Sequence, residues 1–264
     1  MMATFNSAPR PATKWKFAAA LLLLAAGILL AAEEPAKISA TFAKKEFESA
    51  QTRFQSDKKN PTNAWQFARA AFAFAEFSTN DTQRAALANL GIAACRPVVA
   101  GEPKLAAGHY YLAMNLGQLA RTEFLGALAL VKQMEPEFEK AGALDPSLDH
   151  AGPKRNLGLL YRDAPGWPVS VGNPSKSLAL LKQAVKLAPD YPENHLHLIE
   201  AYVKWGEPDD AKKELHALDA IWAAARTSLT GDQWAQSWDN WTARRDAAHK
   251  QLDEKPAPPK KPSN

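Results

Sequence analysis

Apolar residues recur at helical spacing along most of the chain, and two stretches carry nearly the same pattern. The first stretch has its marked positions at Leu157, Tyr161, Ser177, Leu181 and Ala184, and the second at Leu198, Tyr202, Ala211, Leu215 and Leu218. The first two positions recur after 41 residues and the last three after 34. A repeat of about 34 residues predicts antiparallel helix pairs that stack and bury their faces against one another.

The second copy indicates how each helix pair is built. Gly206 lies between two apolar faces, where a tight turn favours a residue without a side chain. Pro189 ends the preceding pair, because proline cannot extend a helix. The first copy differs by a seven-residue insertion that contains the segment 165–168, Pro-Gly-Trp-Pro.

Helical spacing predicts three helices in the first hundred residues. The first is expected near 38–57. Residues 64–77 are apolar on almost every side, which is typical of a helix sandwiched between neighbours. Asp81 is expected to cap the third helix, 81–96, and Pro97 to end it.

Three more helices are predicted before the repeat. Glu102-Pro103 opens the first of them, since proline is tolerated at a helix start, and this helix extends to about Arg121. The second continues from Phe124 to Met134, and a shorter one occupies 135–144.

The C-terminal stretch 230–252 predicts a long amphipathic helix. Thr230 and Gln233 have the spacing of a capping box at its start. One apolar stripe follows this helix at Trp234, Trp238 and Trp241. A stack of helix pairs needs a terminal helix to cover its last exposed face, so we interpret the stripe as that cover, with a partner groove or a membrane-facing surface as the alternative.

These patterns predict a single all-α domain over 33–254, a right-handed α-solenoid of stacked antiparallel helix pairs with about ten helices. The composition agrees, because 46% of the residues are hydrophobic, Ala and Leu are frequent, and alternating β-branched runs are scarce. Residues 255–264 are rich in Pro and Lys, so a disordered tail is expected there.

The net charge of +4 comes from the two ends of the chain. The basic residues of these ends, with no acidic ones among them, are Arg10, Lys14, Lys16, Lys255, Lys260 and Lys261. Without them, 26 basic residues face 28 acidic ones over 33–254, a net charge of −2. Binding to nucleic acid would need a basic stripe on the folded body, so nucleic acid is not an expected partner.

Residues 1–32 resemble an export signal. A basic start is followed by the fourteen apolar residues 17–30 and by Ala31-Ala32, a plausible cleavage edge. The apolar run is shorter than the roughly 20 residues of a membrane-spanning helix, which favours a cleaved signal peptide over an uncleaved N-terminal anchor. The expected location is therefore the periplasm or cell envelope, with anchoring to the inner membrane through residues 17–32 as the alternative.

The sequence offers no pattern for a metal site, a cofactor or catalysis. His195 and His197 are two residues apart and point about 200° from each other on a helix, so we expect helix-start or surface histidines. No nucleophile elbow or phosphate-binding loop is present. The single cysteine, Cys95, lies in an apolar run and is expected to be buried. We therefore expect no enzyme activity.

The stretch 163–173 is the best candidate site, because loops that lengthen a repeat often line a binding surface. Its Trp167 either contacts a ligand or, as a lone aromatic more often does, plugs the gap between two helices. Arg155, Arg162 and Asp163 either bind an acidic partner or pair with one another at little energetic consequence. The candidate ligand or partner surface is Tyr110, Arg155, Tyr161, Arg162, Asp163 and Trp167.

Two sets of residues give the repeat a family resemblance. They are Leu198, Tyr202, Gly206, Ala211 and Leu215 in the second copy, and Leu157, Gly158, Tyr161, Leu181, Ala184 and Pro189 in the first. Over about 149–222 this pattern resembles a tetratricopeptide repeat (TPR), from which Ile199 and Ser177 depart. The resemblance implies an interaction scaffold.

A narrower resemblance involves several short segments. These are 149–153, 157–161, 165–168 and 188–194, together with Tyr110-Tyr111 and 117–121. They are similar to the TatT-like components of TRAP-type periplasmic transporters. That resemblance implies an exported subunit that partners a solute-binding protein and holds a hydrophobic ligand in a central pore. Such subunits often carry a lipid-anchoring cysteine, which is missing after residues 17–30.

The expected function is that of a non-enzymatic binding or scaffold protein of the cell envelope. A TatT-like transport role predicts an apolar pore near Tyr110, Tyr161 and Trp167 that retains a small apolar ligand. A general protein scaffold predicts a polar, charged groove. An enzyme with a helical-repeat fold, the third alternative, predicts titratable groups that converge in a cleft. Oligomerisation is left open.

Overall fold

The computed structural model describes residues 15–123 and 126–253, with side chains from residue 35 onward. Within these residues every regular element is a helix, and the one β-bridge is an isolated pair, Gly166 and Gly172. The helices are α1 (Trp15–Ser56), α2 (Pro61–Ala75), α3 (Asp81–Gly101), α4 (Ala106–Ala120), α5 (Ala127–Leu144), α6 (Leu148–Asp163), α7 (Pro174–Leu187), α8 (Pro192–Lys204), α9 (Pro208–Ser228), a short 3₁₀ turn η1 (Asp232–Trp234) and α10 (Ala235–Asp253). The predicted all-α solenoid of helix pairs is confirmed.

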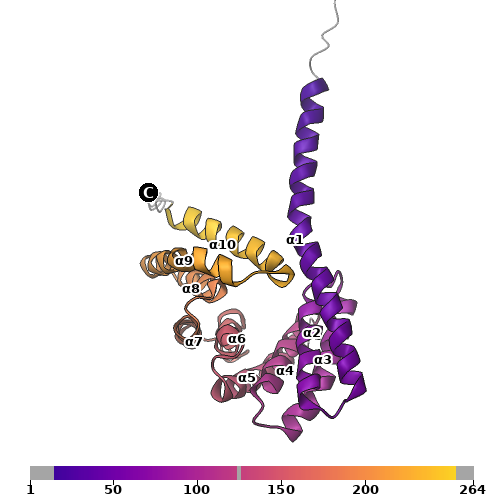
Figure 1. Cartoon of the computed structure of the whole chain (residues 1–264). Helices are drawn as coiled ribbons and strands as arrows, with labels where there is room; N and C mark the ends of the chain where they lie inside the picture. Colours follow the sequence, from indigo (N-terminus) through magenta and orange to yellow (C-terminus); the bar gives the residue numbers. More distant parts are fainter. Residues whose placement is uncertain (1–14, 124–125, 254–264) are drawn as a thin grey trace, which may run out of the picture.

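The helices form two rows (Figure 1). In one row, α2, α4, α6, α8 and α10 contact one another in chain order, and we call this the inner row. In the other, α3, α5, α7 and α9 each pair with the inner-row helix that precedes them. Three hydrophobic clusters fill the space between the rows: one around α1–α3, one around α4–α6, and one from α6 to α10.

Asparagine caps and prolines at the first helical position set several helix starts. Asn60, Asn80 and Asn173 each accept a hydrogen bond from a backbone N–H of the following helix. Proline is the first residue of α2, α7, α8 and α9. The expected cap Asp81 is wrong by one residue, because Asn80 is the cap and Asp81 is already helical.

The helix end expected at Pro97 and the helix boundary expected between residues 134 and 135 both lie within continuous helices. α3 continues through Pro97 to Gly101, since Cys95 and Val98 on either side are buried and hold the helix against the stack. α5 continues through Pro136, so the segments ending at Met134 and starting at 135 are one helix. Buried neighbours outweigh the loss of one backbone hydrogen bond at each proline.

Two predicted helix starts are also wrong. Glu102-Pro103 opens no helix: Leu105 N–H bonds to the Glu102 carbonyl in a turn, and α4 begins at Ala106. Thr230 and Gln233 form no capping box, because the Gln233 side chain donates to the backbone carbonyl of Thr230. η1 follows that turn and α10 starts at Ala235.

The first helix is longer than predicted, because α1 joins the expected helix 38–57 to the segment before it. The side chains of 1–34 and the tail 255–264 are outside the described residues, and so are the predictions made for them. Where side chains are described, no helix has the length and apolar character needed to cross a membrane.

Candidate functional site

Two adjoining cavities lie along the inner row. The larger, about 530 Å³, is lined by side chains of α2 and α4 and by the turns that lead into α6 and α8. Its lining residues are Trp65, Arg69, Tyr111, Ser147, Leu148, Asp149, His150, Leu187, Ala188 and Asp190.

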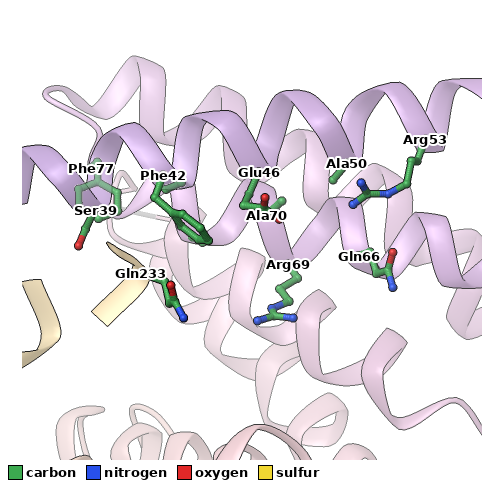
Figure 2. Close-up of a pocket in the computed structure, with 12 residues that line it drawn as sticks. Ser39, Phe42, Glu46, Ala50, Arg53, Gln66, Arg69, Ala70, Phe77 and Gln233 are labelled. Carbon is green, nitrogen blue, oxygen red and sulfur yellow. The ribbon is translucent and has the colours of Figure 1, made fainter. Parts of the chain in front are cut away.

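The second cavity, about 440 Å³, lies between α1, α2 and Gln233 of η1 (Figure 2). Phe42 and Glu46 of α1 face Arg69 of α2 across it, and Gln233 lies at one end. Arg69 lines both cavities, so they form one continuous surface, which we call the Arg69 groove. Arg69 is exposed and has no ion-pair or hydrogen-bond partner among the described side chains.

Asp149 and His150, which line the larger cavity, belong to an unusual backbone turn. Asp149, His150 and Ala151 have φ of 53°, 54° and 63°, so three successive non-glycine residues are left-handed. Each left-handed residue costs roughly 1–2 kcal/mol relative to the right-handed form. Such strain persists only where the surroundings hold it, and it is typical of functional sites.

Arg155 and Asn194 hold this turn from below. The buried Arg155 Nη1 donates to the carbonyl of His150 at 3.0 Å and to Asn194 Oδ1 at 3.0 Å. The Asn194 amide, fully buried, donates to the same His150 carbonyl at 3.1 Å. The guanidinium also lies 3.5 Å from Asp149 Oδ2 and 5.2 Å from the ring centre of Tyr191. Arg155 therefore shapes the site and is not exposed to a partner.

Tyr110 fixes the Asp149 carboxylate. Its hydroxyl donates to Asp149 Oδ2 at 2.6 Å and accepts from Asn156 Nδ2 at 3.0 Å. Burial, and then the charge of Asp149, raise the pKa of Tyr110 well above its ordinary value of 10.0, so the hydroxyl keeps its proton. Two of the six candidate residues, Tyr110 and Arg155, thus meet at Asp149.

Aromatic rings form the sides of the larger cavity. Trp65 and Tyr111 stack with ring centres 5.8 Å apart and planes 6° apart. On the opposite side His150 stacks on Tyr191, with ring centres 4.3 Å apart. Trp234 meets both of these rings edge-on. The larger cavity therefore presents flat ring faces together with one exposed cation, the guanidinium of Arg69.

The other four candidate residues lie elsewhere. Tyr161 is buried, and its hydroxyl donates to Glu135 at 2.7 Å. Burial, and then this hydrogen bond, raise its pKa above 10.0. These residues do not converge on the apolar pore that a TatT-like role predicts near Tyr110, Tyr161 and Trp167, because both tyrosines are packed in one core cluster and Trp167 is 88% exposed.

Arg162 and Asp163 pair with one another, which is the second of the two alternatives for them. Two hydrogen bonds of 2.9 and 3.0 Å join their side chains, and Arg162 also reaches Glu200 at 3.2 Å. Burial would raise the pKa of Glu200, but hydrogen bonds from His197 and Arg244 lower it to about 2. These charges link α6, α8 and α10 to one another.

Trp167 does not plug the gap between two helices. Its loop is held by its own backbone, with Gly172 N–H bonded to the Pro165 carbonyl at 2.9 Å and Ser170 N–H to Gly166 at 3.2 Å. Asn173 N–H joins the loop to the Tyr161 carbonyl at 2.8 Å. The space between α6 and α7 is already filled, because Ser177 is fully buried and its hydroxyl donates to the Gly158 carbonyl at 2.7 Å.

His195 lies in the first turn of α8, as the helix-start alternative predicts. It is buried, and its ring nitrogens lie 2.5 Å from Glu214 and 2.7 Å from the Pro189 carbonyl. His197 lies 3.4 Å from Glu193 and 3.2 Å from Glu200. Among the described residues no group of three or more His, Cys, Asp and Glu could hold a metal ion.

Sequence reasoning missed Arg69 and Trp65. A signal was available, because Arg69 is the only basic residue in the largely apolar stretch 64–77. A charge within an apolar helix must reach solvent or a partner, and here it lies in the groove.

Comparison with known proteins agrees with this architecture. Residues 169–221 match the family model of the tetratricopeptide repeat. No curated protein matches the chain. The structure of TTC0263, a thermophilic TPR protein in Thermus thermophilus, is similar with a TM-score of 0.55 and 19% identity, covering 82% of this chain and 98% of that one.

Two structures of MamA are more distantly similar. One has a TM-score of 0.48 and 14% identity, covering 69% of this chain and 89% of that one. The other, MamA 41-end from Desulfovibrio magneticus RS-1, has a TM-score of 0.41 and 16% identity, covering 71% and 97%.

The chain is therefore an all-α helical-repeat protein. The segment 169–221 carries a tetratricopeptide repeat, and the likeness to the Thermus protein extends the same fold over most of the body. Tetratricopeptide repeats are modules for protein–protein interaction.

Proposed function

We propose that this protein is a non-enzymatic scaffold that binds a segment of another protein in the Arg69 groove. The observation that carries the proposal is the groove itself: an exposed arginine between aromatic faces, above a strained turn. The inner row of a helical-repeat stack is the surface on which such proteins bind partners. An exposed cation beside aromatic rings suits a segment with both apolar and acidic side chains.

Site-specific crosslinking in cells tests this proposal. A photo-crosslinking residue at Trp65, in the groove, is expected to capture a defined partner. The same residue at Lys212, on the exposed side of α9, is expected to capture none. Equal capture at both positions would contradict a groove-bound partner.

A charge reversal sharpens the same experiment. Arg69→Glu is expected to reduce crosslinking at Trp65 by about tenfold, the effect of losing one well-placed charged contact. Arg96→Glu is the matched control, because Arg96 is an exposed arginine on α3, outside both cavities. If both variants weaken crosslinking equally, net charge and not the groove determines binding.

A finer proposal concerns location and partner. We propose an exported envelope protein whose partner is a periplasmic solute-binding protein, as the resemblance at 149–153 and 165–168 implies. Asp149 and His150, which belong to the first of these segments, line the Arg69 groove. Cell fractionation with N-terminal sequencing, and identification of the crosslinked partner, test the two parts separately. Only cytosolic partners would contradict both.

A further inference from the structure

The two ends of the stack touch each other. α1 contacts α2 along the chain, and it also contacts η1 and α10, which lie almost two hundred residues later (Figure 1). Among the described residues, all other contacts between helices join helices that are consecutive, or next but one, along the chain. The contact of α1 with η1 and α10 therefore closes what would otherwise be an open array, and we call it the end-to-end contact.

One buried serine makes the hydrogen bonds of this contact. Ser39 of α1 is 3% exposed. Its hydroxyl donates to the Asp232 carbonyl at 2.9 Å and accepts from the Gln236 N–H at 3.1 Å. The first N–H groups of a helix have no partner within the helix, and Gln236 is the second residue of α10. Ser39 thus caps α10 from another helix, as an N-cap residue does for its own.

The end-to-end contact forms one end of the smaller cavity. Ser39, Phe42 and Gln233 all line that cavity, and Figure 2 shows them together at the same end of it. Separation of η1 from α1 would widen this end of the Arg69 groove. Gly231, with φ of 102°, precedes η1 and supplies a backbone position that other residues rarely adopt.

Opening of the contact would divide none of the three hydrophobic clusters. Within the described residues, no hydrophobic cluster contains residues of both α1 and α10: Phe47 and Ala50 belong to one cluster, and Trp238 and Trp241 to another. Contacts that are polar and few open more often than buried apolar ones.

We propose that the end-to-end contact is a gate, closed by Ser39, that controls access to the Arg69 groove. The proposal rests on the proposed function in so far as the groove is the binding site. In the closed state Ser39 and Gln233 bound this end of the 440 Å³ cavity. In the open state the end of α10 moves away from α1 and a bulky group can enter.

A thiol in the cavity reports on this gate. The parent protein carries Cys95→Ala, which removes the only native thiol, and Ala73→Cys, which places one on the cavity wall. Two reagents are compared, the small methyl methanethiosulfonate and the bulky fluorescein maleimide. Ser39→Ala is expected to speed labelling by the bulky reagent about fivefold, the factor that loss of its two weak hydrogen bonds gives, and to leave the small reagent unaffected.

The experiment is completed by a matched control variant and by a variant in which a disulfide holds the contact closed. Thr41→Ala should leave both rates unchanged, because Thr41 is exposed and its hydroxyl bonds only to Lys37 of the same helix. Ser39→Cys with Gln236→Cys, oxidised to a disulfide, should slow the bulky reagent below the parent rate. This disulfide-linked variant tests the gate even if Ser39→Ala fails to fold.

Two results would overturn the gate. One is equal bulky-reagent labelling in the parent and Ser39→Ala, and the other is labelling that the disulfide does not slow. Neither result depends on a protein partner. Loss of partner crosslinking at Trp65 with intact gating would therefore contradict only the proposed function.

Discussion

At the scale of single residues, Arg155 shows how a charged side chain can serve a site without meeting its ligand. It is 5% exposed, and its guanidinium donates to backbone carbonyls of the turn at Asp149 and His150. The sequence placed Arg155 among the candidate surface residues, but it could not indicate that the turn is left-handed. Three successive left-handed residues without glycine follow from contacts with Asn194, 39 residues away from Arg155.

Replacement of Arg155 is the prediction at this scale. Arg155→Met should lower the free energy of unfolding by about 3 kcal/mol, because it removes the buried cation beside the Asp149 carboxylate and the guanidinium hydrogen bonds to the Asp149 and His150 carbonyls. Arg121→Met is the control, since Arg121 is half exposed and pairs with Glu76 at the surface, a pair worth at most about 1 kcal/mol. Urea unfolding of both variants measures the difference. Equal losses would mean that Arg155 does not hold the turn.

At the scale of elements, the apolar spacing identified the helix pairs correctly, whereas local signals were less reliable. A helix end was expected at Pro97 and a boundary between residues 134 and 135, but both positions lie within continuous helices, α3 and α5, that bury residues against the stack. Ser177 departs from the family pattern, yet its hydroxyl bonds to the Gly158 carbonyl and its small size lets α6 and α7 approach. Propensity is a local quantity, and packing against another helix overrode it at each of these positions.

The structure also contains a duplicated element that the sequence did not reveal. His109 of α4 lies 2.6 Å from Glu137 of α5 and 3.1 Å from the Pro103 carbonyl. His195 of α8 has the same partners, Glu214 of α9 and the Pro189 carbonyl. In each pair both ring nitrogens face an acceptor oxygen. At His195 the protonated imidazole can donate to both partners, whereas the neutral ring can donate to only one.

This arrangement predicts a pH dependence of stability. Burial would lower the pKa of His195, but Glu214 and the Pro189 carbonyl raise it above 6.5. The stabilisation is therefore fully present below about pH 6.5 and is lost as the pH rises through the higher folded-state pKa.

The variant His195→Gln tests this assignment by thermal unfolding over pH 5.5–8.5, a range of about three units around the ordinary histidine pKa. It should lack that part of the pH dependence and be less stable at low pH. The control His249→Gln removes a half-exposed histidine that pairs with Asp219 at the surface. A wild-type stability that rises from pH 6 to about pH 8, through the ordinary histidine pKa, would contradict the assignment.

At the scale of the whole molecule, three separate cores are joined in series and closed by one polar contact. The cluster from α6 to α10 shares no members with the cluster around α1–α3. In helical-repeat proteins each unit is stabilised mainly by its nearest neighbours, so a cavity in one cluster should act locally. The sequence predicted the stack but not its closure, because Ser39 carries no signal that it will bond to residues 232 and 236.

Local destabilisation is thus the expected result of a cavity at Leu181, which is fully buried between α6 and α7. Leu181→Ala should cost about 3 kcal/mol, the typical effect of this change in a core. Hydrogen exchange should accelerate in α6–α9, while amides of α2 and α3 keep their protection, since the end-to-end contact is too weak to transmit the loss. Leu218→Ala, in the same cluster, should give the same pattern. Uniform acceleration across α2 and α3 would instead show that the closed stack unfolds as one unit, and the gate would then open only with the whole protein.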